Sequence, residues 1–338
     1  MLALMAPLCV IASNEHDERS VLPGLRYEPV QPLPAPTGLN PRKVGLGERL
    51  FRDPRLSRDE DMACVSCHDL ETNGADRYAR PPGRDNTRLE VNTLTVFNAS
   101  LNHRQFWDGR ADGLEEQIDF VVAGEKEFAT RWPVIVGKLK QDPEYRSAFG
   151  KLYPDGITAD NIRDAIATFE RSLVTVNSRF DRYLLGDTKA IDAEEKQGYQ
   201  LFKDYGCAAC HQGHNVGGNL FVKFGVFKDY FATRGNLTKA DFGRFNVTGR
   251  KEDRHVFRVP SLRLAVLTPP YFHDGSVATL EDAIKVMAEH QLGREIPPRD
   301  IRRIIAFLKT LPGEYRGRPL IARGDEEPAA TKPEGSVE

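Results

Sequence analysis

The five-residue pattern Cys-x-x-Cys-His occurs twice in this chain, as CVSCH at residues 64–68 and as CAACH at residues 207–211. Two thiols three positions apart lie on one face of a helical turn, and the histidine that follows can turn its imidazole onto a metal. A thioredoxin-like redox pair needs no histidine, and a zinc ribbon needs its second Cys-x-x-Cys about 15–20 residues after the first. The pattern is typical of covalent attachment of a c-type haem.

Two covalently bound haem c groups are therefore predicted. Their thioethers would form at Cys64, Cys67, Cys207 and Cys210, and their irons would be bound by His68 and His211. Because such attachment takes place outside the cytoplasm, we expect a periplasmic protein with an export signal. Residues 1–12, MLALMAPLCVIA, resemble a signal segment in their apolar core and small final residues, but no Lys or Arg precedes the core. We expect an incomplete or atypical leader that removes Cys9 with it.

The overall charge is balanced, since 47 Lys and Arg residues face 49 Asp and Glu residues for a net charge of -2. A protein that binds nucleic acid usually carries a basic stripe or patch, and no run of like charges forms one here. A membrane-spanning helix needs about 20 mostly apolar residues in succession, and the chain has no such run. The sequence thus predicts a globular protein with no nucleic-acid partner and no membrane span.

An internal repeat surrounds the two motifs. Before them, GERLFRD at residues 47–53 matches GYQLFKD at residues 198–204. After them, a Trp-Asp-Gly turn at residues 107–109 and LEEQI at residues 114–118 match a His-Asp-Gly turn at residues 273–275 and LEDAI at residues 280–284. A repeat of this kind indicates two similar structural units in tandem.

Apolar residues between the motifs recur with helical spacing. One stripe runs from Ile162 to Leu173 after the N-cap candidate Thr158, and another lies within residues 298–308. Thr279 is the predicted N-cap of a helix that continues through Met287. Because strand signals are sparse, we expect a mostly α fold of two tandem cytochrome c-like haem domains with long connecting loops and little β structure. The predicted segments are a leader (1–12), an extended N-terminal segment (13–40), an N-terminal haem domain (41–184), a C-terminal haem domain (185–316) and a flexible polar tail (317–338).

The sixth coordination position is expected to differ between the two irons. A strong protein ligand there favours electron transfer, whereas an open position favours chemistry with a small ligand. Met287 follows the second Asp-Gly turn and can supply a thioether, while Val121, at the same distance from the first turn, cannot bind iron. We expect an open first haem and a second haem bound by His211 and Met287. The competing interpretation is that Met287 is an ordinary core methionine.

Several segments resemble the bacterial dihaem cytochrome c peroxidases, a family that includes relatives of the methylamine dehydrogenase maturation protein. The similar segments are LFRDPRLS before the first haem motif, TVFNAS and QFWDGR after it, and VFRVPSLR and TPPYFHDGSVATLE after the second. The resemblance covers nearly the whole chain after residue 40. It implies a two-domain α-helical fold, a peroxidatic N-terminal haem, a high-potential C-terminal haem and a calcium ion between the domains.

The resemblance also implies roles for residues at matching positions. Gln117 and Glu127 match the distal pocket of the first haem, and Trp107 matches the aromatic residue between the two haems. The matching calcium set is Asn92, Thr268 and Pro270, the last two through backbone carbonyls, although such loop residues are ordinarily turn residues. A carboxyl group with a raised pKa can carry a proton between the two oxygens of peroxide, which suits Glu127, and Gln117 can position the peroxide by hydrogen bonds.

One departure from the family pattern concerns activation. Many dihaem peroxidases close the oxidised first haem with a histidine from the loop after its motif, and reduction of the second haem releases it. Here that loop reads ARPPGRDN, with Arg84 at the place of the histidine. We therefore expect an enzyme that is active without prior reduction.

Three functions follow from these features. The leading one is reduction of hydrogen peroxide to water with electrons from a small cytochrome c or a cupredoxin, by a chain that can form a homodimer as the family commonly does. The alternatives are a high-valent oxidase that modifies a partner protein, as in quinone maturation, and a non-catalytic dihaem electron carrier. Met287, in place of the tyrosine of the quinone-maturing relatives, favours peroxide reduction, and the missing ligand at Val121 argues against the carrier.

Overall fold

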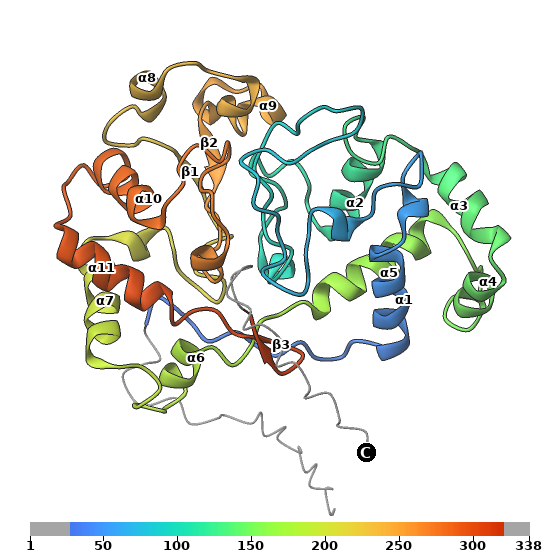
Figure 1. Ribbon diagram of the computed structural model, residues 1–338, viewed down its shortest axis with the longest axis horizontal. Coiled ribbons are helices and arrows are strands. Elements are labelled where there is room, and N and C mark those ends of the chain that lie inside the picture. The colour runs from blue at the N-terminus through green and yellow to red at the C-terminus, as the bar shows by residue number, and fades with distance from the viewer. Residues whose placement is uncertain (1–27, 321–338) are drawn as a thin grey trace, which may run out of the picture.

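The computed structural model describes residues 28–320. The predicted leader with Cys9 and residues 321–338 of the predicted tail lie outside the described residues. The fold is mostly α, as predicted, with two small antiparallel sheets. In the ribbon, helices α1 to α5 occupy one half of the molecule and helices α6 to α11 the other (Figure 1). No helix of the described part combines the length and apolar character needed to cross a bilayer.

The secondary structure comprises helices joined by long loops. The α-helices are α1 (Pro41–Phe51), α2 (Leu114–Ala123), α3 (Trp132–Gln141), α4 (Pro143–Gly150), α5 (Ala159–Ser172), α6 (Arg179–Leu184), α7 (Ala193–Asp204), α8 (Tyr230–Arg234), α9 (Phe245–Thr248), α10 (Leu280–Val286) and α11 (Pro298–Leu308). Short 3-10 turns are η2 (Pro54–Leu56), η3 (Cys64–Ser66), η4 (Ala99–Leu101), η5 (Cys207–Ala209), η6 (Lys239–Phe242), η7 (Lys251–Asp253) and η8 (Ala265–Leu267), and η9 (Met287–Gln291) is a π-helical segment. The strands are β1 (Phe221–Lys223), β2 (Val256–Arg258), β3 (Glu314–Tyr315) and β4 (Arg318–Pro319).

The internal repeat takes the form of two equivalent helix pairs. Helix α1 packs on α5 in one half, and α7 packs on α11 in the other. Each pair meets at a glycine of the repeated sequence, because a Cβ atom at Gly47 would lie 2.0 Å from the carbonyl oxygen of Ala165 and one at Gly198 would lie 1.9 Å from that of Arg303. Both distances are far below van der Waals contact. The repeated glycines therefore let the two helix backbones approach each other.

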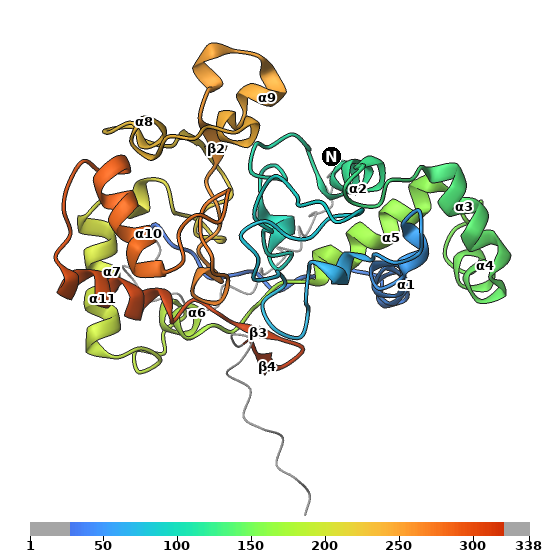
Figure 2. The same cartoon turned by 45° about the horizontal axis from the view of Figure 1, so that its top comes forward.

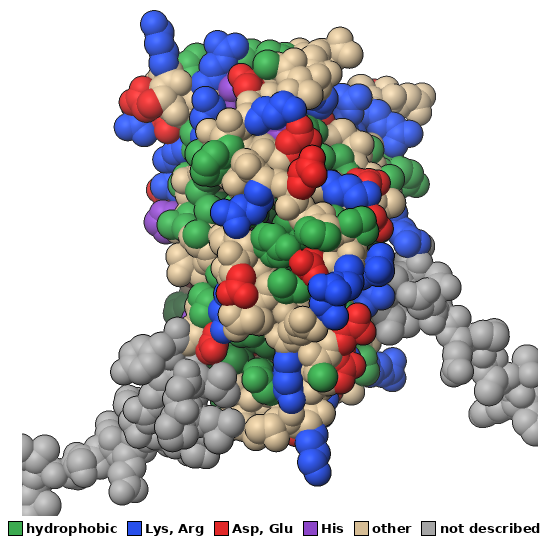
Figure 3. All heavy atoms as spheres, turned by 90° about the vertical axis from the view of Figure 1, so that its left-hand side faces the viewer, with side chains coloured by type: hydrophobic (Ala, Val, Ile, Leu, Met, Phe, Trp, Pro, Cys, Tyr) green, Lys and Arg blue, Asp and Glu red, His purple; other side chains and the backbone are tan. Residues whose placement is uncertain are grey.

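Each half buries its own apolar cluster. The first cluster draws on α1 to α5 and centres on Leu50, Phe51 and Phe169, while the second draws on α6, α7 and α11 and centres on Phe202 and Phe307. The helices α3 and α4 lie at the outer end of the first half, and β3 and β4 lie below the junction of the halves (Figure 2). On the face at the outer side of the second half, basic and acidic side chains are interspersed (Figure 3).

Local sequence signals explain where several elements begin. Thr158 accepts a hydrogen bond from the backbone N–H of Asn161 and Thr279 accepts one from that of Asp282, which confirms both predicted N-caps. The prediction that the helix after Thr279 continues through Met287 is wrong. Helix α10 ends at Val286, and Met287 is the first residue of the π-helical segment. The strand β4, which belongs to the predicted polar tail, pairs with β3, and Leu320 joins the apolar cluster of the first half, so the described part of that tail is ordered.

The two Asp-Gly turns also have matching backbones. Phe106 and Phe272 precede the turns, and each has φ of 69°. Gly109 and Gly275 follow with φ of 67° and 63°, values that glycine adopts without strain. The flanking bridges match as well, since Gln105 pairs with Ala111 in one half and Tyr271 pairs with Val277 in the other. The repeat in the sequence is thus a repeat of backbone geometry on both sides of the haem motifs.

Candidate functional site

Both Cys-x-x-Cys-His motifs form the same short turn. The first cysteine opens a 3-10 turn, η3 or η5, and its carbonyl oxygen accepts a hydrogen bond from the histidine backbone N–H at 3.0 Å in each motif. Burial raises the pKa of all four thiols, to about 11 at Cys207 and about 12 at Cys67. The turn places both thiols and the imidazole at the edge of one cavity in each half.

The two histidine rings are oriented through their Nδ1 atoms. Nδ1 of His68 lies 3.0 Å from the carbonyl oxygen of Gly74, and Nδ1 of His211 lies 3.4 Å from that of Val216. When Nδ1–H donates to a carbonyl, the Nε2 lone pair is left free for a metal. Burial lowers the pKa of both rings, to about 4 at His211, so both are neutral at pH 7. Neutral, oriented imidazoles are suited to bind haem iron.

The first cavity measures about 180 Å³ and joins the first motif to residues that lie far from it in the sequence. Gln117 and Val121 enter it from α2, and Glu127 enters it from the loop after that helix. The cavity therefore brings together Cys64, Cys67, His68, Gln117 and Glu127. The remaining lining is largely apolar, with Phe51, Leu56, Ile118 and Ile166 among its residues. No cysteine, methionine or histidine besides the motif and Met62 lines this cavity among the described residues.

The carboxyl group of Glu127 has a pKa that is shifted into the neutral range. Burial raises its pKa to about 7, and the positive charge of Arg110 only partly opposes this shift. Arg110 is itself engaged, because its guanidinium lies over the ring of Phe106 and is paired with Asp108 at 3.1 Å. Among the described residues, burial and the charge of Arg110 are the influences that act on the pKa of this carboxyl group. A carboxyl group with a pKa near the working pH can both accept and donate a proton.

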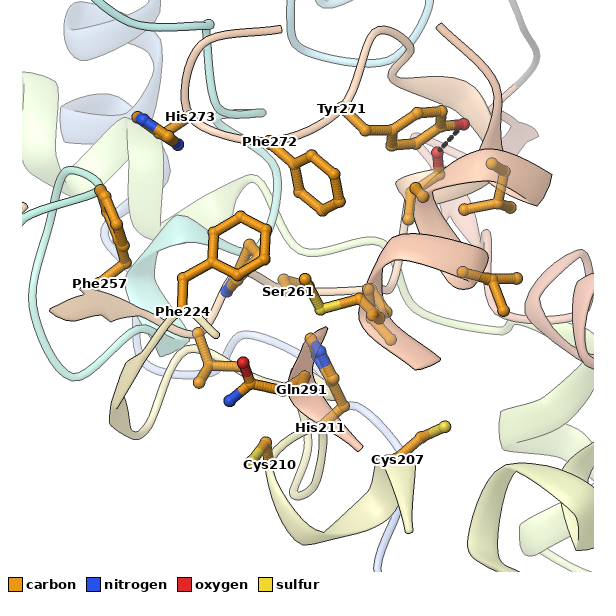
Figure 4. A pocket seen from close by; sticks show the side chains of 18 of the residues that line it. Cys207, Cys210, His211, Phe224, Phe257, Ser261, Tyr271, Phe272, His273 and Gln291 are labelled. Atoms are coloured by element: carbon orange, nitrogen blue, oxygen red, sulfur yellow. Dashed lines mark hydrogen bonds between the residues drawn. The ribbon is translucent and has the colours of Figure 1, made fainter. Parts of the chain in front are cut away.

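The second cavity is larger, about 250 Å³, and is built around the second motif. Figure 4 shows His211 pointing from its turn into the cavity, with Phe224 and Phe272 across from it. Met287 lines this cavity, whereas Val121, its equivalent in the repeat, lines the first. The two cavities therefore differ at the position where a sixth iron ligand is expected.

A shared wall separates the cavities, and seven residues line both, among them Asn92, Trp107 and Arg258. The indole N–H of Trp107 donates to the carbonyl oxygen of Asn92 at 2.9 Å. The backbone N–H of Asn92 in turn donates to the carbonyl oxygen of His273 at 2.8 Å. The rings of His273 and Trp107 meet edge to face, with their centroids 6.4 Å apart. Trp107 is thus fixed in orientation between the two cavities.

The three residues that were expected to bind calcium lie beside this wall. Asn92, Thr268 and Pro270 all line the second cavity. The Asn92 side-chain amide N–H donates to the carbonyl oxygen of Tyr78 at 2.9 Å, which leaves its amide oxygen available. The Thr268 hydroxyl donates to the carbonyl oxygen of Leu264. The structure brings these three residues to one region without assigning them a ligand.

Arg84 lies close to the first cavity but is not among the residues that line it. Its side chain is only 2% exposed and forms ion pairs with Asp59 and, at 2.8 Å, with Asp61. Its backbone N–H donates to the carbonyl oxygen of Lys126 at 2.9 Å, one residue before Glu127. The loop that carries Arg84 is therefore held between the segment before the first motif and the Glu127 loop.

Four further histidines of the described chain have a ring nitrogen within hydrogen-bond distance of a partner: His214, His255, His273 and His290. His290, the residue closest to Met287 that could replace it, directs Nδ1 to the carbonyl oxygen of Lys228 at 3.0 Å and does not line the second cavity. Asp241, His273 and Asp274 come together as a metal-like cluster, but Arg234 pairs with both carboxylates. The guanidinium of Arg234 therefore offsets one of the two carboxylate charges of this cluster.

Two buried residues at the cavities were not predicted from the sequence. Glu170 on α5 lines the first cavity, and burial raises its pKa to about 8. Arg258 lies in the VFRVPSLR segment, but that segment alone does not indicate that its guanidinium is buried at the shared wall. Burial of a charged residue depends on contacts between distant segments, which a single sequence does not display.

The cavities fit haem c by the chemistry of their donors. Each offers two thiols for thioethers, a neutral histidine with a free Nε2 and a largely apolar lining. Arg258 adds a buried guanidinium nitrogen with no partner in the described protein, as expected if a carboxylate of a bound group completes the site. These residues would hold one haem in each half.

Known proteins share both the sequence and the fold. Residues 41–189 match the family described as di-haem cytochrome c peroxidase. Cytochrome c peroxidase Ccp of Escherichia coli (strain K12) is 44% identical over 294 residues, 87% of this chain and 63% of that protein, so the chain spans less than two thirds of this relative's length. Cytochrome c551 peroxidase of Nitrosomonas europaea is 44% identical over 288 residues, 85% of each chain.

A more distant relative and a solved structure complete the comparison. Methylamine utilization protein MauG of Methylorubrum extorquens is 35% identical over 298 residues, 84% of this chain and 82% of that protein. The crystal structure of a MauG-like protein associated with microbial copper homeostasis superposes with a TM-score of 0.73 at 27% identity, covering 86% of this chain and 94% of the other. The similarity thus extends across both halves of the fold.

Proposed function

Because the chain belongs to the di-haem cytochrome c peroxidase family, which implies two haem c cofactors, we propose that it reduces hydrogen peroxide to water with electrons from a small redox protein. The observation that carries the proposal is the difference between the cavities: the first combines Glu127 and Gln117 with Val121, and the second has Met287 in the equivalent place. The reaction consumes two electrons and two protons per peroxide. When bound, the two haems supply the redox chemistry.

Glu127 is the proposed acid–base group. With a pKa of about 7 it is present in both protonation states at neutral pH, so it can take the proton from one peroxide oxygen and return it to the other. Gln117 is neutral and can orient peroxide by hydrogen bonds without adding charge. The apolar lining of the cavity keeps bulk water from competing for these hydrogen bonds, which strengthens them.

Trp107 is the proposed bridge for electrons between the halves. Its place in the shared wall and its fixed indole support this role, because electron transfer slows steeply as the gap between redox groups widens. In this proposal the N-terminal domain (41–184) is peroxidatic and the C-terminal domain (185–316), with His211 and Met287 as iron ligands, receives electrons from the donor. The repeated helix pairs and the two apolar clusters support that division.

Calcium is the proposed ion at the wall. Amide and carbonyl oxygens are the hard ligands that calcium prefers, and Asn92, Thr268 and Pro270 can offer them from one region. An ion there would fix Asn92, whose carbonyl oxygen holds the indole of Trp107. Treatment with a chelator followed by elemental analysis tests this: loss of one calcium per chain with a change in Trp107 fluorescence supports the site, and absence of calcium from the purified protein removes it.

We also propose that the fully oxidised protein is active without prior reduction. The ion pairs of Arg84 with Asp59 and Asp61 support it, because they hold this loop residue outside the first cavity, and a guanidinium does not bind iron. Peroxide turnover begun from fully oxidised protein should then equal turnover begun from protein carrying one electron. A lag that a single electron abolishes would contradict it.

The proposed reaction is tested by peroxide consumption with a reduced small cytochrome c or a reduced cupredoxin as donor. We expect turnover by the periplasmic holoprotein, and a loss of about 10²–10⁴-fold in E127Q, the range typical of a removed acid–base group. E125Q, two positions away on the exposed side of the same loop, is the matched control and should keep full activity. Equal turnover by E127Q and E125Q would contradict the assignment.

A further inference from the structure

Arg258, the last residue of β2, is a charged side chain buried between the two cavities. It is 3% exposed and lines both of them, beside Trp107. Its backbone N–H donates to the carbonyl oxygen of Trp107 at 2.8 Å, and its Nε–H donates to that of Phe106 at 3.1 Å. The backbone of the turn before the first Asp-Gly pair thus fixes the base of the guanidinium group at the wall.

One nitrogen at the far end of this guanidinium has no partner in the described protein. Nη1 of Arg258 is buried and makes no hydrogen bond within the described protein. Desolvation lowers its pKa to about 10, and no carboxylate opposes the shift. A buried cation without a counter-charge costs several kcal/mol of stability, so such groups are normally paired.

Other buried arginines of this chain are paired. Arg263 is fully buried and meets the Asp181 carboxylate at 2.7 Å, with carbonyl oxygens of Gln31 and His214 on its remaining nitrogens. Arg84 is buried and pairs with two aspartates. Because Arg258 lines both cavities, a group that occupies one of them can supply the counter-charge that Arg258 lacks.

We propose that Arg258 binds a propionate carboxylate of the bound haem at the shared wall and raises the reduction potential of the haem it anchors. Haem c brings propionate carboxylates into its cavity, and a guanidinium pairs with a carboxylate through two parallel N–H donors. The carboxylate can come from the haem in either cavity, because Arg258 lines both. The proposal rests on haem binding alone, so a chain that failed to reduce peroxide would still test it.

A positive charge held beside a haem favours the state with the extra electron. Replacing Arg258 by a neutral residue therefore removes a positive charge that stabilises the reduced haem, and the midpoint potential of that haem falls. R258Q removes the charge but keeps polar atoms, while R258K keeps the charge and loses the paired donors. Arg244 offers a matched control, because its Nη1 is also buried without a partner and its guanidinium lies over the ring of Phe221, yet it lines neither cavity.

The experiment is a spectroelectrochemical titration of the holoproteins together with a count of haem per chain. We expect R258Q to reduce the equilibrium constant for reduction of at least one haem by at least tenfold. For a one-electron couple this lowers the midpoint potential by about 59 mV. R258K should shift it less, and R244Q should not shift it. The haem whose midpoint moves identifies the cavity that supplies the carboxylate.

Two results would overturn the proposal. One is wild-type midpoints for both haems in R258Q, and the other is an equal shift in R244Q. If R258Q does not take up both haems, R258K decides the matter through the vibrational bands of the haem propionates in resonance Raman spectra. A change in those bands in R258K but not in R244Q supports the pairing, and unchanged bands in both overturn it.

Discussion

Replacing Glu127 by glutamine tests how much the buried carboxyl group lowers the free energy of unfolding, separately from its role in the reaction. The side chain enters an apolar cavity, where burial raises its pKa from 4.5 to about 7. Glutamine has nearly the same shape and carries no titratable proton. E127Q should therefore fold as the wild type does while losing the pH dependence that the carboxyl group brings.

The magnitude follows from proton linkage. Below pH 4.5 the carboxyl group is protonated in the folded and the unfolded chain and contributes nothing. As the pH rises above 4.5 the unfolded chain releases its proton first, which favours unfolding until the folded-state pKa of about 7 is passed. At about 1.4 kcal/mol per pKa unit, the wild type loses about 3 kcal/mol of unfolding free energy at pH 8 and less than about 1 kcal/mol at pH 5.

The assay is unfolding of the oxidised holoprotein by guanidinium chloride at both pH values, with E125Q as the control. E127Q should be more stable than the wild type by about 3 kcal/mol at pH 8, with most of that gain gone at pH 5. E125Q should differ little from the wild type at either pH, because its side chain is exposed. A gain that is equal at both pH values, or no gain at pH 8, would refute the account of the Glu127 pKa.

Three further predictions concern the helix pairs, the second cavity and the Arg84 loop. Gly47→Ala forces a Cβ against the carbonyl oxygen of Ala165 and should lower the unfolding free energy by about 1–3 kcal/mol in the same assay, whereas Gly45→Ala, on the open side of α1, should not lower it. Met287→Leu should make the second haem high-spin and lower its midpoint in a redox titration; an unchanged low-spin signal would mean that another residue binds that iron. Arg84→Ala should speed amide hydrogen exchange in residues 81–90 while the spin state of the first haem stays the same, and unchanged exchange would show that the ion pairs do not hold the loop.

Features that depend on neighbouring residues alone could be predicted from the sequence. Thr158 and Thr279 are N-caps because a threonine hydroxyl before a helix satisfies a free backbone N–H, and this needs no knowledge of the rest of the fold. The repeat likewise predicted matching helices around the two motifs. Its glycines had no evident reason in the sequence, and Gly47 and Gly198 acquire one only when the partner helices are in place.

Other features depend on contacts between distant segments. The π-helical segment at Met287 interrupts a stretch whose apolar spacing reads as plain α-helix. Glu170 and Arg258 look like surface residues in the sequence, yet tertiary packing buries both at the cavities. A single sequence gives spacing and residue type, but burial without a partner becomes visible only in three dimensions.

In the proposed function, one haem site is open and the other is closed by a protein ligand. Electron paramagnetic resonance of the fully oxidised holoprotein, without any reductant, tests it most directly because it reports the spin state of each ferric haem. We expect one high-spin signal from the site with Val121 and one low-spin signal from the site with His211 and Met287, in equal amounts. Two low-spin signals would contradict it, because a protein ligand would then close the first cavity as well.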